Sequence, residues 1–336
     1  MYTFGLSGGA GAFDSLVLLL IALALETYIG EARFLFKAGR HPAQVFHRLV
    51  AALDRKLNRE SRSQADRALR GFLVVVFVVV PCAATGWGTA WLTQNHAFGW
   101  IVELVFLVML LAQRRVYDNA RAVAHALSEH GQEPARRALS KMAGRNVAHL
   151  DEHGVARATI ERVAENICAG AVAPVFWYVL LGFPGILVYK AVNFMDAMIG
   201  QSTPRYRAFG MTAAGLDDAL SLIPARLAGL FIVLAAVIVP TARPGRAWKV
   251  MLRDAGKHRT FNAGWPAGAM AGALDLALAG PRRYAERTVK APWIGGGSAR
   301  ATDRDIGRAL HVYVIACLIN ALGVAAIASV RLGVQG

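Results

Sequence analysis

Cysteine is scarce in this chain of 336 residues, and its scarcity excludes two kinds of protein. The three cysteines, Cys82, Cys168 and Cys317, are an odd number, and no two of them form a CxxC pair. A disulfide-rich secreted fold and a zinc site built from paired thiolates are therefore excluded.

Acidic residues are also few, with 22 Asp and Glu against 37 Lys and Arg, which gives a formal net charge of +15. Only 18% of the residues are charged, whereas 55% are hydrophobic. This balance leaves three classes open: a membrane protein, a nucleic-acid binder or a soluble protein with a large core.

Two common nucleotide-binding motifs are absent, because the sequence contains neither a GxxxxGK[ST] nor a GxGxxG segment. A P-loop and the usual dinucleotide fingerprint are therefore excluded. The basic residues stand between apolar runs and lack interleaved aromatic residues, which argues against a nucleic-acid partner.

Long apolar runs are abundant and decide between the remaining classes. Residues 71–92 (GFLVVVFVVVPCAATGWGTAWL) carry no charge and are long enough to cross a bilayer. Other apolar segments lie at 15–30, 98–112, 171–192, 219–240 and 311–332. The sequence predicts an all-α, polytopic integral membrane protein, formed by one domain over residues 1–336, with about four to six transmembrane or re-entrant helices.

The basic residues predict the orientation of these helices. They concentrate in segments 31–70, 113–165 and 241–310, which the positive-inside tendency places in the cytoplasm. Segments 171–192 and 219–240 must then both cross the membrane or both re-enter it. The first contains LLGFPG, a Gly/Pro break that suits a helical hairpin lining a protected cavity, so both alternatives stay open.

A polar stripe interrupts the apolar sequence ILVYKAVNFMDAMIG at residues 186–200. At about 100° per residue, one face of a helix carries Tyr189, Lys190, Asn193 and Asp196. Val188, Met195, Met198 and Ile199 lie outside that face. The stripe therefore faces either water or a lined interior.

Three further polar clusters stand at the edges of apolar segments. Glu161 and Glu165 share a helix face, where two like charges need a nearby cation. Asp217 and Asp218 begin a run that is closed by Pro224 and Arg226, and Gly264, Gly268 and Gly272 form a small-residue face with Asn262 and Trp265 at its entrance. Ionisable groups are costly at such positions, so together the clusters indicate a polar cavity within or at the edge of the membrane.

Several of these segments resemble one known family in order and spacing. They are HPAQVFHRL, RATIERVAEN, YKAVNFMDAMIG, RYRAFG, LDD, IPARL and NAGWPAGAMAGAL. The chain resembles the CobD/CbiB family of cobalamin biosynthesis, the adenosylcobinamide-phosphate synthases.

The resemblance implies an amide-forming ligase of the inner cell membrane. It would join adenosylcobyric acid, a corrinoid, to aminopropanol or its phosphate, with ATP consumed and Mg²⁺ as the metal. Carboxylates are the ligands that Mg²⁺ prefers, and arginine and lysine suit phosphate or carboxylate groups. The candidate catalytic residues are Glu161, Glu165, Asp217 and Asp218, of which Glu165, Asp217 and Asp218 are also the candidate metal ligands. The candidate substrate-binding residues are Tyr189, Lys190, Asn193, Asp196, Arg207, Arg226, Asn262 and Trp265.

The chain departs from the family pattern at several positions. Cys168 and Ala169 stand where family members usually carry a hydroxyl and an acidic residue, and GRN at residues 144–146 replaces GRD. The alternatives are a paralogue that is non-catalytic or has an altered substrate, such as a corrinoid-binding sensor or an AmpE-like protein, and a small-molecule transporter. A homo-oligomer is compatible with each alternative.

Overall fold

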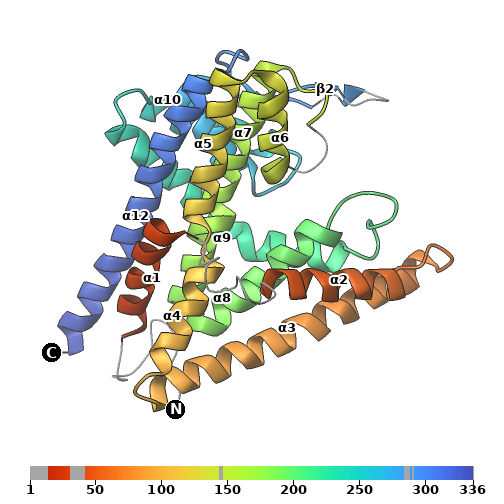
Figure 1. Cartoon of the computed structure of the whole chain (residues 1–336), viewed down its shortest axis with the longest axis vertical. Helices are drawn as coiled ribbons and strands as arrows, with labels where there is room; N and C mark the ends of the chain where they lie inside the picture. The colour runs from red at the N-terminus through yellow and green to blue at the C-terminus, as the bar shows by residue number, and fades with distance from the viewer. Residues whose placement is uncertain (1–13, 31–41, 144–146, 284–287, 290, 336) are drawn as a thin grey trace. The chain divides into compact units, whose positions relative to one another are not determined.

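The computed structural model describes residues 14–30, 42–143, 147–283, 288–289 and 291–335. The GRN segment at 144–146 lies outside these residues. The secondary structure is almost entirely helical (Figure 1), as the sequence predicts. The helices are α1 (Ser15–Ile29), α2 (Pro42–Leu57), α3 (Gln64–Asn95), α4 (Gly99–Leu110), α5 (Gln113–Glu129), α6 (Gln132–Ala143), α7 (Glu152–Asn166), the π-helix η3 (Ile167–Val172), α8 (Ala173–Ile199), α9 (Met211–Ile238), α10 (Pro244–Asp254), the 3₁₀-helix η4 (Ala255–Lys257), α11 (Gly264–Leu274) and α12 (Asp303–Gln335).

Four helices are long and apolar enough to cross a membrane: Gln64–Asn95, Glu152–Ile199, Met211–Ile238 and Asp303–Gly333. The second of them runs through α7, η3 and α8. Helix α1 is apolar but shorter. Each predicted apolar segment lies within a helix to within two residues at its ends, and 98–112 corresponds to the short α4. The chain is a multi-pass membrane protein by the length and composition of these helices.

Helix α8 is broken where the sequence has LLGFPG. Gly182 has φ 67° and ψ −156°, a conformation outside the helical region that favours glycine. Pro184 follows two residues later and lacks the N–H group that a helix interior needs. The predicted Gly/Pro break is present, with helical residues on both sides of it.

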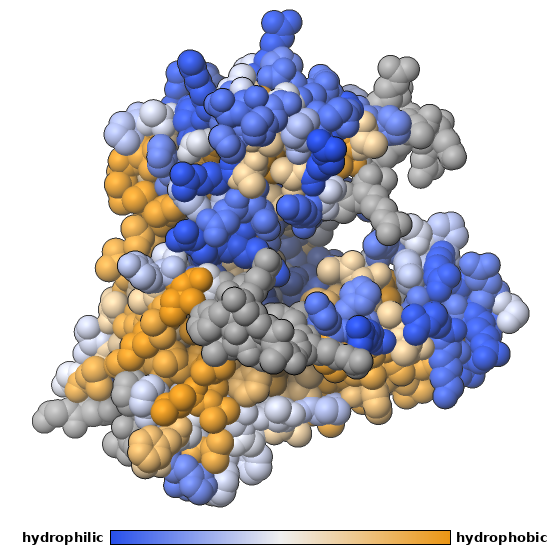
Figure 2. Space-filling view, viewed as in Figure 1, coloured by the Kyte–Doolittle hydropathy of each residue, from blue (hydrophilic) through white to orange (hydrophobic). Residues whose placement is uncertain are grey.

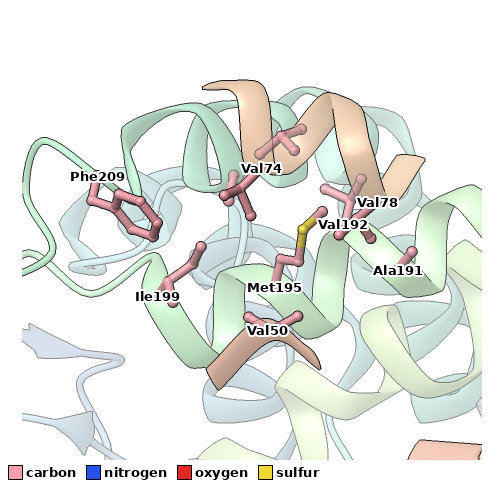
Figure 3. Close-up of a cluster of buried hydrophobic side chains, with 10 residues drawn as sticks. Val50, Val74, Val78, Ala191, Val192, Met195, Ile199 and Phe209 are labelled. Carbon is pink, nitrogen blue, oxygen red and sulfur yellow. The ribbon is translucent and has the colours of Figure 1, made fainter. Parts of the chain in front are cut away.

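The chain divides into two compact units. Unit 1 comprises residues 1–111 and 174–221. Its apolar core lies between α2, α3 and the second half of α8, where Val50, Val74, Val192 and Met195 are buried (Figure 3). Phe209, from the segment that precedes α9, closes the same cluster.

Two hydrogen bonds hold the first half of α8 within unit 1. Tyr178 donates its hydroxyl proton to Glu103 of α4 at 2.6 Å. The indole N–H of Trp177 donates to the carbonyl oxygen of Leu220 in α9 at 3.0 Å. The segment of α8 before the break therefore has a defined rotation about its own axis.

Unit 2 comprises residues 112–173 and 222–336. Helices α5, α6 and α7 pack against one another, and α12 packs along α5 and α7 (Figure 1). Hydrophilic residues gather over the end of this unit that carries α6, whereas α12 exposes large apolar side chains along its length (Figure 2). Four two-residue strands complete the unit: β1 (Leu278–Ala279) pairs antiparallel with β4 (Trp293–Ile294), and β2 (Arg282–Arg283) with β3 (Thr288–Val289).

Helix α11 is buried in unit 2 at every residue except Trp265, and its glycines explain how. Gly264, Gly268 and Gly272 all lie against backbone atoms of the segment that contains α10 and η4. A Cβ atom at Gly272 would be 2.7 Å from the Cα atom of Ala247, closer than real Cβ atoms approach. The predicted small-residue face is confirmed, because only glycine permits this spacing between the two helices.

Candidate functional site

The polar stripe of α8 faces the start of α9 in unit 1. Asn193 donates its side-chain N–H to a carboxylate oxygen of Asp217 at 3.0 Å. Lys190 interacts electrostatically with Asp217, and Asp196 interacts with both Asp217 and Asp218. One cation, one amide and three carboxylates from two helices thus converge in one polar cluster, which we call the α8–α9 cluster.

The opposite face of this part of α8 is apolar and packed. Met195 and Ile199 are buried in the unit 1 core, and Val188 and Met198 pack against it. The predicted separation of the two faces is therefore confirmed, and the stripe faces a neighbouring helix. Tyr189, counted with the stripe from the sequence, is fully buried.

Glycines bring the backbone close to the α8–α9 cluster. A side chain at Gly200 would collide with the carboxylate of Asp196, and one at Gly210 would collide with the carbonyl group of Ile199. The segment between α8 and α9 therefore lies directly over the end of α8. The carboxylate of Asp196, which interacts with Asp217 and Asp218, therefore lies against the backbone of this segment.

A buried polar network fixes the same segment to α2 and α3. Asn58 donates to Asp54 at 2.8 Å, and Arg67 donates to Asn58 at 2.8 Å and to the carbonyl oxygen of Arg205. Arg205 in turn donates to Asp54 at 3.0 Å, which raises the pKa of its guanidinium. Arg207, the predicted phosphate-binding residue, is exposed beside this network.

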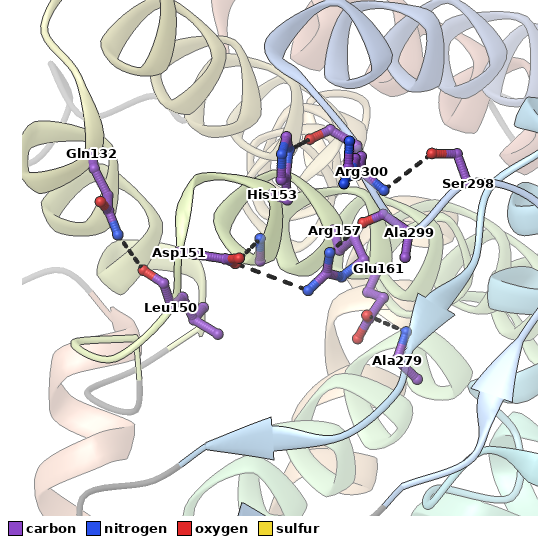
Figure 4. A network of polar contacts seen from close by, with 12 residues as sticks. Gln132, Leu150, Asp151, His153, Arg157, Glu161, Ala279, Ser298, Ala299 and Arg300 are labelled. Atoms are coloured by element: carbon purple, nitrogen blue, oxygen red, sulfur yellow. Dashed lines mark hydrogen bonds and ion pairs between the residues drawn. The ribbon is translucent and has the colours of Figure 1, made fainter.

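Glu161 occupies a buried position in unit 2 (Figure 4). Its carboxylate accepts a hydrogen bond at 2.6 Å from the backbone N–H of Ala279, at the end of β1. Arg157, one turn earlier, donates to the carbonyl oxygen of Ala299 and stands 5.5 Å from the ring centre of Trp293. The two residues line a cavity of about 330 Å³ together with Asp151. Glu161 therefore anchors the strand that follows α11.

Glu165 makes two polar contacts on the next turn of α7. Arg162 donates to one carboxylate oxygen at 2.8 Å, and the ring of His258 lies 3.6 Å from the other. The Arg162 guanidinium is the compensating cation that two like charges four residues apart require.

An aromatic pair holds Arg226 at the start of α11 in the same unit. The guanidinium of Arg226 lies 4.6 Å from the ring centre of Trp265 and 5.6 Å from that of Phe261. Asn262, between the two aromatic residues, is buried. Asn262 and Trp265, two predicted substrate-binding residues, stand at the entrance to the glycine face as expected. The contact of Arg226, a third such residue, with Trp265 was not predicted.

The candidate metal ligands belong to both units. Glu165 is in unit 2, whereas Asp217 and Asp218 are in unit 1. Within the described residues, no three His, Cys, Asp or Glu side chains form a group that could hold a metal ion by themselves. The magnesium role of Glu165, Asp217 and Asp218 remains a prediction.

Asp254 is a fully buried carboxylate that sequence reasoning missed. It accepts hydrogen bonds from Arg253 at 2.7 and 2.8 Å and from the backbone N–H of Gly295 at 2.8 Å, and Lys257 lies 2.7 Å away. The Arg253 guanidinium, with Lys257 and the Gly295 amide, holds the pKa of this carboxyl well below its usual range. Asp254 therefore fastens the glycine-rich turn after β4 to the end of α10.

Comparison with known proteins identifies the family. The family model described as CobD/Cbib protein matches residues 19–313. The chain belongs to this family. A protein named "Cobalamin biosynthesis protein CobD" from Brucella anthropi is 40% identical over 309 residues, which cover 89% of this chain and 92% of the relative. Its namesake from Brucella suis biovar 1 is 42% identical over 301 residues, with the same coverage of each chain.

A relative of the same name from Sinorhizobium sp. is 40% identical over 321 residues, which cover 94% of this chain and 98% of the relative. No solved structure matches the chain. Family membership gives the protein a role in cobalamin biosynthesis. The matched region contains both the α8–α9 cluster and the residues around α11.

Proposed function

We propose that this protein is an amide-forming ligase that joins a carboxylate of adenosylcobyric acid to aminopropanol or its phosphate at the inner cell membrane. The observation that carries the proposal is the α8–α9 cluster, in which Lys190, Asn193 and Asp196 of α8 stand with Asp217 and Asp218 of α9. The family role in cobalamin biosynthesis supplies the substrate class.

The reaction requires both an activated acid and a neutral amine. ATP, when bound, supplies the phosphoryl group that makes the carboxylate electrophilic, and Mg²⁺ offsets the charge of the phosphates. Mg²⁺ usually takes one or two protein carboxylates and completes its shell with water and phosphate oxygens. Asp217 and Asp218 fit that donor set, whereas Glu165 is already engaged by Arg162 and His258.

The remaining members of the cluster have separate roles in this proposal. Lys190 provides positive charge for a carboxylate or phosphate. Asp196 is placed to attract the ammonium group and to take its proton, which leaves the neutral amine that can attack. Asn193, through its 3.0 Å hydrogen bond, fixes the orientation of Asp217. Attack by the amine nitrogen on the acyl carbon then expels phosphate, which takes up the second proton that the nitrogen loses.

Complementation of a strain that lacks the synthase tests this function, with the corrinoid products identified by mass. We expect the parent chain to restore the aminopropanol-containing product. Asp217→Asn and Asp218→Asn should abolish restoration while the protein still inserts and accumulates, because each swap removes a charge and opens no cavity. If both variants restore the product like the parent, the two carboxylates are structural.

A parent chain that fails to restore the product would refute the ligase proposal itself. Binding of the corrinoid by that inactive chain would then favour the non-catalytic paralogue. Appearance of a corrinoid joined to another amine would favour the altered substrate.

A further inference from the structure

Unit 2 contains a polar cavity of about 520 Å³ that lies apart from Glu161, Glu165 and α11's aromatic entrance. Its wall is built from the segment after α9, the end of α11 and the first turns of α12. The charged and polar residues that line it are Thr241, Arg243, Asp275, Arg300, Asp305 and Arg308. None of these residues belongs to a family motif noted in the sequence.

The cavity lies at the end of the apolar sequence of two membrane-spanning helices, α9 and α12. Residues 227–242 carry no charge, and Arg243 is the first charged residue after them. Residues 309–330 also carry no formal charge with His311 neutral, and Arg308 is the last charged residue before them. Arg308 donates to the carbonyl oxygen of Thr241 at 2.7 Å, so both boundaries coincide at this cavity. That level corresponds to the headgroup layer of the bilayer.

The charges of the cavity leave a positive excess. Asp275 is paired with two arginines, Arg243 at 2.9 Å and Arg246, and Asp305 is paired with Arg308 at 2.9 Å. Three arginines and two carboxylates therefore line the cavity, and Arg246, outside the lining, adds a fourth cation beside Asp275. Within the described residues, no carboxylate pairs with the guanidinium of Arg300, whose backbone N–H is held by the hydroxyl of Ser298 at 3.1 Å.

The arginines also retain donors. Each guanidinium has five N–H groups in a fixed fork that matches phosphate oxygens. Arg243 uses one nitrogen on Asp275, and Arg308 uses one on Asp305 and one on the Thr241 carbonyl oxygen. A phosphate in the cavity would therefore meet Arg300 together with unused N–H groups of its neighbours, without breaking an ion pair.

We propose that this cavity binds a phosphate group at the membrane surface, with Arg300 as the main ligand and Arg243 and Arg308 beside it. Two sources carry the same chemistry: the phosphodiester of an anionic lipid headgroup and a free phosphate from the solution. Basic pockets between membrane helices on the cytoplasmic side of a membrane hold anionic lipid headgroups in other proteins. The site is independent of the α8–α9 cluster and of the proposed ligase activity.

Two measurements on the purified full-length protein separate the sources. Inorganic phosphate is titrated into the protein in detergent, with binding followed by calorimetry. In parallel, nanodiscs of phosphatidylglycerol or of phosphatidylcholine are used, and native mass spectrometry counts the lipids that the protein retains. Binding of inorganic phosphate supports the solution source, and preferential retention of phosphatidylglycerol supports the lipid source.

Arg300→Gln is the decisive variant, because Arg300 is exposed and its side chain makes no ion pair within the described residues. We expect it to weaken phosphate binding, or retention of phosphatidylglycerol, roughly tenfold. Arg304→Gln is the matched control, since Arg304 is an exposed arginine in the first turn of α12 that does not line the cavity. Arg243→Gln, at another exposed arginine, repeats the test if the first variant accumulates poorly.

Two results would overturn the proposal. The first is that the parent binds neither inorganic phosphate nor phosphatidylglycerol in preference to phosphatidylcholine. The second is that Arg304→Gln weakens binding as much as Arg300→Gln, because the effect would then belong to the general positive charge of the surface.

Discussion

Asn193 offers a sharp test of whether the polar stripe of α8 acts in chemistry. Replacing Asn193 with leucine removes the amide that donates to Asp217 at 3.0 Å and leaves a side chain of similar size. A hydrogen bond to a charged group contributes about 1.5–3 kcal/mol. If the bond orients Asp217 during the reaction, the rate per inserted molecule should fall roughly 10- to 150-fold.

The assay is product formation by membranes that contain equal amounts of correctly inserted protein. Val188→Leu is the matched control, because Val188 packs against the unit 1 core on the other side of the same helix. Adding one methylene there should cost at most about 1–3 kcal/mol of stability and leave the rate per molecule nearly unchanged. Lys190→Met, which removes the charge at similar length, should lower activity like Asn193→Leu.

Asn193→Gln separates positioning from a general loss of polarity, because it keeps an amide that can donate to Asp217. It should therefore retain more activity than Asn193→Leu. An equal loss in the two variants would mean that Asn193 does not act through its hydrogen bond to Asp217. Equal activity of Asn193→Leu, Lys190→Met and Val188→Leu would show that the stripe is only a solvated edge, and the reasoning would be refuted.

Three further predictions concern stability and topology. Gly272→Ala should destabilise the protein by about 1–3 kcal/mol in thermal unfolding, because the added Cβ atom would lie 2.7 Å from the Cα atom of Ala247. Gly268→Ala should destabilise it less, because the nearest backbone atom there is 3.1 Å from the added Cβ atom. Equal effects of the two variants would contradict the close packing of α11. Because the pKa of Asp254 is lowered in the folded protein, its contribution to stability is complete above the ordinary aspartate pKa of about 4 and is lost as the pH falls below that value. Asp254→Asn should therefore be less stable than the parent at pH 7 and should lose less stability than the parent between pH 5 and pH 3. The same pH dependence of stability in parent and variant would contradict this prediction. In a variant without native cysteines, Glu60→Cys and Gly256→Cys should resist an impermeant thiol reagent in intact cells, and labelling at either position would contradict the predicted orientation.

Local patterns in the sequence predicted the parts of the molecule that depend on neighbouring residues. The uncharged run 71–92 predicted the membrane-spanning part of α3, and the spacing of Gly264, Gly268 and Gly272 predicted a closely packed helix face. The stripe on α8 was also predicted, since helical periodicity alone separates Asn193 from Val188. Its convergence with Asp217 and Asp218 was expected only from their shared position at the edges of apolar segments.

Contacts between distant parts of the chain were not predictable in this way. Arg67 and Arg205 are 138 residues apart, and Glu161 and Ala279 are 118 apart. No periodicity relates such residues, because their meeting depends on the tertiary packing of whole helices. Asp254 was missed for the same reason, since its partner Gly295 lies 41 residues away in a glycine-rich turn. Arg207 was named from residue type, which cannot reveal that Arg205 makes the ion pair with Asp54, 151 residues away.

The π-helix η3 contains one residue more than an α-helix of the same rotation would need. Its six residues, Ile167–Val172, are wound more widely than the α-helices that they join. Because a π turn holds about one residue more than an α turn, deleting a single residue there would let ordinary α-helical bonding continue and would leave the following residues in nearly the same orientation about the helix axis. The same deletion within α7 would instead turn the residues that follow it by about 100° relative to those before it. Single-residue deletions should thus be tolerated better in η3 than in α7, a contrast that a deletion scan along residues 152–172 would measure.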